Sequence, residues 1–182
     1  MPDVPAPVTE PVPEPPPAPV SVRLATGADR PTVDRLWLLF RHDMSQFDRA
    51  LPYPDGTFRS ERLDAAFTRA DWAPYLVTAG ASPAGFAFVR GLDAPARVLN
   101  SFFVVRGARG AGVGLHAARE VVARHPGPWE IAFQDANTAA AAFWRRVATA
   151  TAGAAWTEEQ RGVPGRPDLP PDTWITLDTT PR

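Results

Sequence analysis

The residues best suited to chemistry lie in a glycine-rich loop, residues 106–114, which reads RGARGAGVG. Four glycines fall within eight residues there, and glycine allows a backbone to approach a ligand closely. An apolar run, residues 98–105, precedes the loop and predicts a buried strand. Apolar residues recur at helical spacing after it, from Val113 to Val122. A loop between a strand and a helix start offers free amides and the positive end of a helix dipole, which suit an anionic pyrophosphate.

Two kinds of nucleotide-binding loop fit these glycines. The dinucleotide fingerprint G-x-G-x-x-G/A of oxidoreductases matches residues 112–117, GVGLHA, and Asp135 follows the next predicted strand, where a ribose-binding acid belongs. The acyl-CoA signature Q/R-x-x-G-x-G/A matches residues 109–114, RGAGVG, position for position. A fingerprint glycine normally follows its strand at once, whereas residues 106–110 intervene here, so the second match is the better one. Through it the chain resembles the GNAT superfamily of acyl-CoA-dependent N-acyltransferases.

A second signature of this superfamily follows on the next predicted helix. Asn137 stands where the N-cap of that helix should be. Together with Ala140, Phe143 and Trp144 it resembles the pattern N-x-x-A followed by an aromatic pair. Two signatures at this separation extend the resemblance over roughly residues 22–147.

The elements that must position these motifs follow from apolar spacing and turn residues. Strands are expected at residues 20–24, 75–77, 85–89, 98–105, 129–134, 154–160 and 174–177, and helices at 31–47, 59–69, 113–122 and from 137 onward. This order predicts an α/β (α+β) fold with a mixed central sheet of about six to seven strands and about four helices. The resemblance implies a GNAT fold whose sheet is splayed at the acyl-CoA site.

Composition narrows the class of protein further. The 182 residues are expected to form a disordered proline-rich tail, residues 1–20, and one GNAT domain, residues 21–182. The net charge of −1 gives no electrostatic footprint for nucleic acid or an anionic membrane. The absence of cysteine excludes disulfides, thiolate metal sites and a cysteine acyl-enzyme. Neither a signal peptide nor an apolar span is present, so we expect a cytoplasmic protein.

The resemblance implies a reaction and a set of contacts. An acetyl group passes from acetyl-CoA to a primary amine of a small molecule by direct attack in a ternary complex, without a metal. Main-chain groups of the central strand bind the pantetheine arm, amides of the loop bind the phosphates, and the Asn of the second signature faces the arm. The implied acyl-CoA-binding residues are Phe103, Val104, Val105, Arg109, Gly110, Ala111, Gly112, Val113, Gly114, Asn137 and Phe143.

The chain departs from the common superfamily pattern at the catalytic positions. Many members carry a glutamate on the central strand, where this chain has Asn100 and Ser101, and a tyrosine in the second signature, where it has Trp144. An indole N–H is a donor but no useful acid. Substitutes acting through water are Asp135, Glu130, Tyr75 and His42. The alternatives are therefore a catalytically degenerate acyl-CoA-binding protein and, on the overlapping fingerprint, a dinucleotide-binding oxidoreductase domain.

The acceptor is expected between the loop that joins the first two helices and the closing strands. Asp43, Asp48, Tyr53 and Asp55 occur in or beside that loop, and carboxylates near an apolar rim suit a cationic amine with an aromatic or alkyl portion. The alternative is that the charges form only a solvated surface. We leave a homodimeric assembly open.

Overall fold

The structure is a computed structural model that describes residues 18–163, 165 and 168–181. Most of the tail predicted over residues 1–20 lies outside these residues. The described chain contains four α-helices: α1 (Arg30–Asp48), α2 (Glu61–Thr68), α3 (Val113–Ala123) and α4 (Thr138–Ala152). It contains seven strands: β1 (Val20–Leu24), β2 (Trp72–Ala79), β3 (Ser82–Arg90), β4 (Arg97–Val104), β5 (Pro128–Phe133), β6 (Trp156–Arg161) and β7 (Asp172–Asp178).

All seven strands form one mixed sheet in the order β1-β2-β3-β4-β5-β7-β6. Neighbouring strands are antiparallel except β4 and β5, which are parallel and are joined by the crossover helix α3. The predicted α/β class and the predicted numbers of strands and helices are confirmed. The sheet is not the doubly wound parallel sheet that a dinucleotide-binding domain requires, so the oxidoreductase alternative is wrong.

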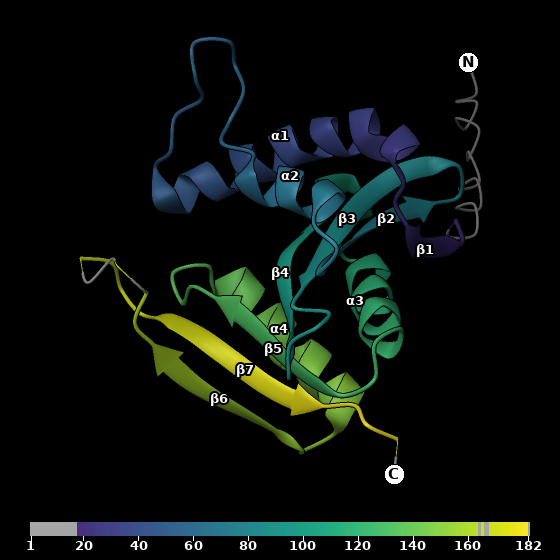
Figure 1. Cartoon of the computed structure of the whole chain (residues 1–182), viewed down its shortest axis with the longest axis vertical. Helices are drawn as coiled ribbons and strands as arrows, with labels where there is room; N and C mark the ends of the chain where they lie inside the picture. Colours follow the sequence, from purple (N-terminus) through teal and green to yellow (C-terminus); the bar gives the residue numbers. More distant parts are fainter. Residues whose placement is uncertain (1–17, 164, 166–167, 182) are drawn as a thin grey trace, which may run out of the picture.

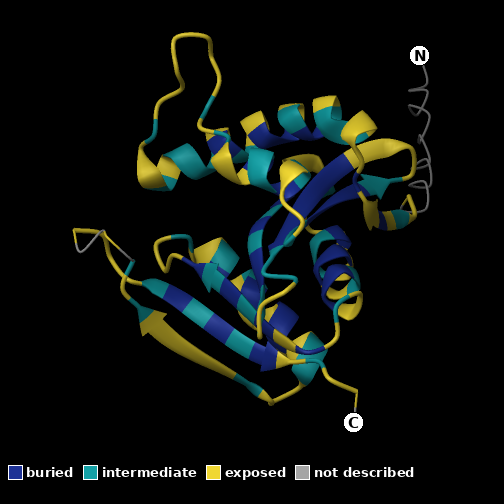
Figure 2. Ribbon diagram, in the orientation of Figure 1, coloured by how far each residue is buried: buried dark blue, intermediate teal, exposed yellow. Residues whose placement is uncertain are grey.

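The helices cover the two faces of the sheet unequally (Figure 1). On one face α3 packs on β1 and β2 and contacts α4, which covers β5, β6 and β7. On the other face α1 and α2 pack against β2 and β3. Along β7, buried residues alternate with partly exposed ones, and most of β6 is exposed (Figure 2). The α1 side of the carboxy-terminal strands is therefore open to solvent.

Each face has its own apolar core because side chains alternate along a strand. On the α1 side, Trp37, Phe86 and Phe88 stack with ring centroids 4.6–5.9 Å apart. On the α3 side, the fully buried residues include Trp129 and Ile131. Burial of each such side chain stabilises the fold by about 1.5–3 kcal/mol, so the two cores hold the sheet from both sides.

The central strand β4 carries a bulge and then leaves its neighbour. Ser101 pairs with Phe88 and Leu99 with Val89, so Asn100 has no partner on β3. On its other side β4 pairs with β5 only over residues 97–99. After Leu99 the two parallel strands part, which is the splay that the resemblance implies.

Gly85 lets β3 and β4 approach closely beside this opening. A Cβ atom at Gly85 would lie 2.1 Å from the carbonyl oxygen of Phe103, a distance that no real side chain tolerates. The residue is therefore required to be glycine for the backbone of β4 to keep its present course.

We expect Gly85→Ala to lower the free energy of unfolding by about 1–3 kcal/mol, because the added methyl must push the two strands apart. Urea denaturation measures the effect. The matched control is Gly27→Ala, where no atom lies within 4 Å of the added carbon. Equal stabilities of the two variants would contradict the close approach.

His125 is a second, half-buried constraint, located just after α3. Its Nε2 lies 2.6 Å from the hydroxyl of Tyr75, and its carbonyl accepts a hydrogen bond from the indole of Trp129 at 2.9 Å. Burial lowers the pKa of His125, and the charges of Arg97 and Arg124 lower it further. The half-buried site beside Tyr75 and Trp129 therefore favours the neutral imidazole.

The free energy of unfolding should consequently fall as the pH drops below about 6.5, the ordinary pKa of histidine. In that range the unfolded chain binds a proton at His125 more readily than the folded chain does. The stability is fully present above that pH. His125→Gln should reduce this dependence below about pH 6.5, and His116→Gln, which removes a histidine at an exposed position, is the control. Thermal denaturation across pH tests both, and an unaltered slope in His125→Gln would refute the assignment.

Candidate functional site

A cavity of about 720 Å³ lies where β4 and β5 part. Its walls come from the second half of α1, from β4, from the glycine-rich loop and the start of α3, and from the first half of α4. The predicted acyl-CoA-binding residues that line it are Phe103, Val104, Arg109, Gly110, Gly112, Gly114, Asn137 and Phe143. Val105, Ala111 and Val113 are not among its lining residues. The two sequence signatures therefore meet at one cavity.

The main chain of β4 presents an unpaired edge to this cavity. The N–H of Val105 donates to the carbonyl of Ala84 at 2.9 Å, so Val105 faces β3. Because main-chain groups alternate in direction along a strand, Phe103 faces β3 as well, whereas Phe102 and Val104 face the gap left by β5. Of the three residues expected to offer main-chain groups to a ligand, Val104 directs them to the gap, and Phe102 does so as well.

The side chain of Arg109 already occupies part of this edge. Its Nε donates to the carbonyl of Val104 at 2.8 Å, and its Nη2 donates to Oδ2 of Asp43 at 2.6 Å. Arg106 reaches the other oxygen of the same carboxylate at 2.8 Å. Burial raises the pKa of Asp43, but the hydrogen bonds from Arg109 and Arg106 outweigh that effect and leave the pKa below its ordinary value. Asp43 is thus an ionised anchor that ties α1 to the loop.

The glycine-rich loop has the backbone that close approach requires. Gly110 and Gly112 adopt φ angles of 88° and 82°, which side-chain-bearing residues rarely adopt. Gly112 is the N-cap of α3, and its carbonyl accepts from the N–H of His116 at 3.0 Å. The amides of residues 113–115 precede that bond and have no acceptor within the helix. No protein atom lies within 4 Å of a Cβ built at Gly110 or Gly112, so the loop surface is open.

The start of α4 forms the opposite wall. Oδ1 of Asn137 accepts from the N–H of Ala140 at 3.0 Å, which confirms the predicted N-cap. The rings of Phe102, Phe143 and Trp144 contact one another with centroids 4.7–5.6 Å apart. No hydrogen bond of the Trp144 indole occurs within the described residues, and Trp144 lines the cavity. The aromatic part of this wall is therefore apolar apart from the Trp144 N–H, while Asn137, Thr138 and Arg146 add polar groups.

The catalytic candidates from the sequence do not supply a free acid or base. Ser101 is buried and donates to Oδ1 of Asn100 at 3.3 Å. The carboxylate of Asp135 accepts hydrogen bonds from Gln160 and Thr173. Of the substitutes, Glu130 is ion-paired with Arg161, Tyr75 is buried beside His125, and His42 is exposed on α1. Among the described lining residues, Asp43 is the one carboxylate, and two arginines neutralise it.

The structure does not bring the four predicted acceptor residues together. Asp43 lies at the cavity. Asp48 pairs with Arg41 at 2.9 Å and accepts from the N–H of Ala50. Asp55 closes a turn with Thr57 in the loop between α1 and α2, which projects away from the body of the molecule, and Tyr53 in that loop is 54% exposed (Figure 1). A shared acidic surface for a cationic amine is therefore not formed.

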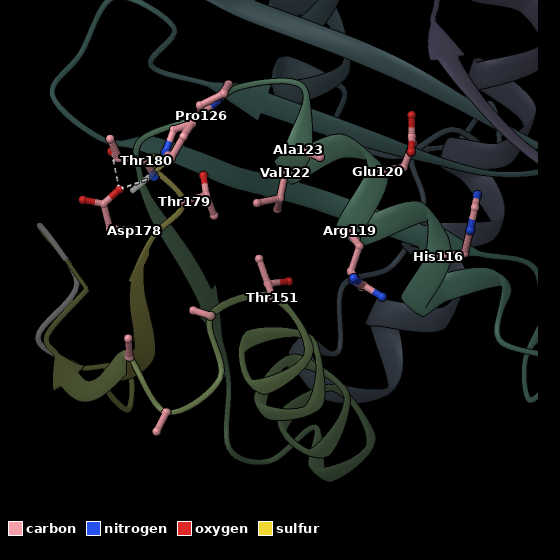
Figure 3. A pocket seen from close by; sticks show the side chains of 14 residues that line it. His116, Arg119, Glu120, Val122, Ala123, Pro126, Thr151, Asp178, Thr179 and Thr180 are labelled. Carbon is pink, nitrogen blue, oxygen red and sulfur yellow. Dashed lines mark hydrogen bonds between the residues drawn. The ribbon is translucent and has the colours of Figure 1, made fainter.

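A larger cavity, of about 1110 Å³, lies elsewhere and contains none of the predicted site residues. It is lined by residues of α3, the end of α4 and the end of β7, among them His116, Arg119, Thr151 and Asp178 (Figure 3). It has neither the unpaired strand edge nor the glycine loop, so we assign the chemistry to the smaller cavity.

Sequence reasoning missed the apolar lining of the site. Phe40, Met44 and Phe47 of α1 line the cavity together with Leu115 and Phe102, and none of these five residues was expected at the site from the sequence. For Phe102 a signal existed: it alternates with Ser101 and Phe103 along the strand, which places it on the other face of the sheet.

Two further properties of the described residues bear on the kind of site. No described helix combines the length and apolarity needed to cross a membrane. Within the described ranges, no three histidine, aspartate or glutamate side chains come together as a metal site.

Comparison with known proteins assigns the fold. The chain has the GNAT fold, the architecture of a large group of acetyltransferases. It aligns over 90% of its length with 96% of the ribosomal-protein-S18-alanine N-acetyltransferase from Escherichia coli, at 13% identity and a TM-score of 0.61. It aligns over 88% of its length with 95% of the spermidine N-acetyltransferase from Vibrio cholerae in complex with CoA and spermine, at 9% identity and a TM-score of 0.62.

A third similar structure is the ribosomal L7/L12 alpha-N-protein acetyltransferase in complex with coenzyme A, at 15% identity and a TM-score of 0.63, covering 87% of this chain and 93% of that one. No family sequence model matches the chain, and a comparison with curated protein sequences finds no match. The similarity of this chain to these proteins is therefore a similarity of fold.

Proposed function

We propose that the protein is an N-acetyltransferase that transfers an acetyl group from acetyl-CoA to a primary amine of a small molecule. The observation that carries the proposal is the unpaired edge of β4 at Phe102 and Val104, which runs directly into the open glycine loop at the start of α3. A long ligand with amide groups at one end and phosphates at the other fits this sequence of features. Acetyl-CoA has that order of groups.

The residues present fit such a ligand. The free amides of residues 113–115 and the dipole of α3 favour a pyrophosphate. The main-chain groups of Phe102 and Val104 can pair with pantetheine amides as a neighbouring strand would. The aromatic wall of α4, with Phe143, packs against the arm, and Asn137 lies beside it. Arg109 must exchange its bond to Val104 for one to the ligand, and its charge then suits a phosphate.

The chemistry follows from positioning. The free amine attacks the thioester carbonyl, a C–N bond forms, the C–S bond breaks, and the thiolate takes up a proton while the amine loses one. The main-chain N–H of Val104, which faces the gap, is suited to hold the negative charge that develops on the carbonyl oxygen. Correct placement of two reactants contributes up to about 7–11 kcal/mol to such a reaction, which requires no covalent enzyme intermediate.

A second candidate function is acyl-CoA binding without transfer. Ser101, Asn100 and Trp144 favour it, because none of them is an acid or base at neutral pH. Loss of one general acid or base typically slows a reaction by about 10²–10⁴-fold. Transfer in this protein would pass its protons through water, for which Asp135 is one of the candidates expected from the sequence. The cytoplasmic location and the possible homodimeric assembly remain predictions from the sequence.

We expect Gly112→Val to abolish measurable acetyl-CoA binding, since a side chain at a φ of 82° is strained and would project from the surface that the phosphates approach. Gly107→Val is the matched control, because Gly107 lies in the same loop without a positive φ and with no atom within 4 Å. Calorimetric titration measures affinity, and circular dichroism checks folding. A folded Gly112→Val chain with parental affinity would place the ligand elsewhere.

A thiol-release assay separates transfer from binding alone. With acetyl-CoA and a panel of small primary amines, an N-acetyltransferase releases one thiol for each amide formed, and the rate should rise with pH as the amine loses its proton. Release should disappear in Gly112→Val. Tight acetyl-CoA binding without amine-dependent release would instead establish the second candidate function.

A further inference from the structure

The side chain of Arg109 occupies a position on β4 that the pantetheine arm of an acyl donor needs. Its Nε donates to the carbonyl of Val104 at 2.8 Å, and the main-chain groups of Val104 face the gap left by β5. Its guanidinium also lies 5.6 Å from the ring centroid of Phe103. The proposed function assigns the same main-chain groups to the amides of the arm. Arg109 and a donor therefore compete for one hydrogen-bond acceptor.

Asp43 of α1 holds the side chain of Arg109 across this strand edge. Its Oδ2 accepts a hydrogen bond from Nη2 of Arg109 at 2.6 Å, and its Oδ1 accepts from Nε and Nη2 of Arg106 at 3.1 and 2.8 Å. The side chain of Asp43 is only 15% exposed, so the carboxylate depends on these two arginines for its hydrogen bonds. Asp43, Arg109 and the carbonyl of Val104 thus form one chain of hydrogen bonds from α1 to β4.

The side chain of Arg109 is nevertheless able to leave. It is 47% exposed, whereas its main chain is fixed by a short 3-10 turn in which its N–H donates to the carbonyl of Arg106 at 3.1 Å. No atom lies within 4 Å of a Cβ built at Gly110 or Gly112, so open space adjoins Arg109 on the loop. Arg106 still holds Oδ1 of Asp43 when Arg109 departs. The exchange can therefore proceed by rotation of one side chain, and the carboxylate keeps a cationic partner.

The result of the competition depends on what the donor offers to the displaced guanidinium. A donor with a pyrophosphate brings two anionic groups to the loop, and guanidinium and phosphate form paired, charge-assisted hydrogen bonds. A donor that ends in pantetheine brings none, so the bond from Arg109 to Val104 is lost without a new partner for the cation. A cost that one ligand offsets and another does not is a source of specificity.

We propose that Arg109, positioned by Asp43, is a specificity-determining residue that selects acyl donors with a pyrophosphate over donors that consist of pantetheine alone. This inference rests on the proposed function, because it defines which acyl donors the same site accepts. A phosphate contact by itself would make Arg109 a binding residue. Its bond to Val104 adds a barrier to the arm, and the two effects together discriminate between donors.

Two donors and one variant test these opposing effects. Acetyl-CoA and S-acetylpantetheine are titrated calorimetrically into the full chain and into Arg109→Ala, and circular dichroism checks folding. We expect the affinity for acetyl-CoA to fall about tenfold, as for the loss of one charge-assisted hydrogen bond. The affinity for S-acetylpantetheine should rise by a similar factor, because the carbonyl of Val104 is then uncovered. A change of the same sign for both donors, or no change for S-acetylpantetheine, would overturn the proposal.

Asp43→Asn tests the contact with α1 while Arg109 stays in place. The amide has the shape of the carboxylate without its charge, so it holds Arg109 less firmly, and Arg109 still contacts phosphate. We expect S-acetylpantetheine to bind about fivefold more tightly than to the parent. The control is Arg119→Ala, at an exposed position of α3 outside the acyl-CoA cavity, which should leave both affinities at their parental values. Equal or weaker binding of S-acetylpantetheine to Asp43→Asn would contradict the role of Asp43.

These titrations keep the inference distinct from the proposed function, since they need no acetyl transfer. Opposite responses of the two donors to Arg109→Ala would support the selection of donors even if no amine released a thiol, in which case the proposed function alone would fail. Responses of the same sign together with amine-dependent thiol release would overturn the selection and leave the proposed function intact. A parent chain that does not bind acetyl-CoA would overturn both.

Discussion

The parting of β4 from β5 is the constraint on which the rest of the molecule depends. Two parallel strands that stayed paired would satisfy their main-chain groups with each other, and no cavity would exist between them. The bulge at Asn100 turns β4 away after Leu99, and the rings of Phe102, Phe143 and Trp144 fill the space on one side. The two apolar cores then hold the separated halves of the sheet in place, so the opening is a property of the whole packing.

The two faces of the sheet present different groups at this opening. On the α3 side lie the glycine loop, the free amides of α3 and the aromatic wall of α4, which suit a long ligand with phosphates. On the α1 side the helices cover β2 and β3 and leave the carboxy-terminal strands open. A direct transfer between two bound molecules requires two such approaches to one point, and alternation along β4 provides them.

The sequence predicted the fold almost completely because its signals are local. Apolar periodicity, the glycines of the loop and the N-cap Asn137 each depend on a few neighbouring residues. The parts it missed depend on register and on distant partners. Val105 was expected to face the ligand, but the pairing of β4 with β3 turns it away. Asp43 and Asp48 were interpreted as acceptor residues, but Asp43 binds Arg109 of the glycine-rich loop, far along the chain, and Asp48 binds Arg41 of its own helix.

The contact between Arg109 and the Val104 carbonyl has a consequence for the chain before it meets any ligand. An open strand edge is a template on which another chain can add a strand, and proteins commonly protect such edges with a charged side chain. Arg109, held by Asp43, covers the carbonyl of the exposed edge with a cation. Arg109 therefore protects the edge of β4 against pairing with another chain, a role separate from the phosphate contact proposed for it.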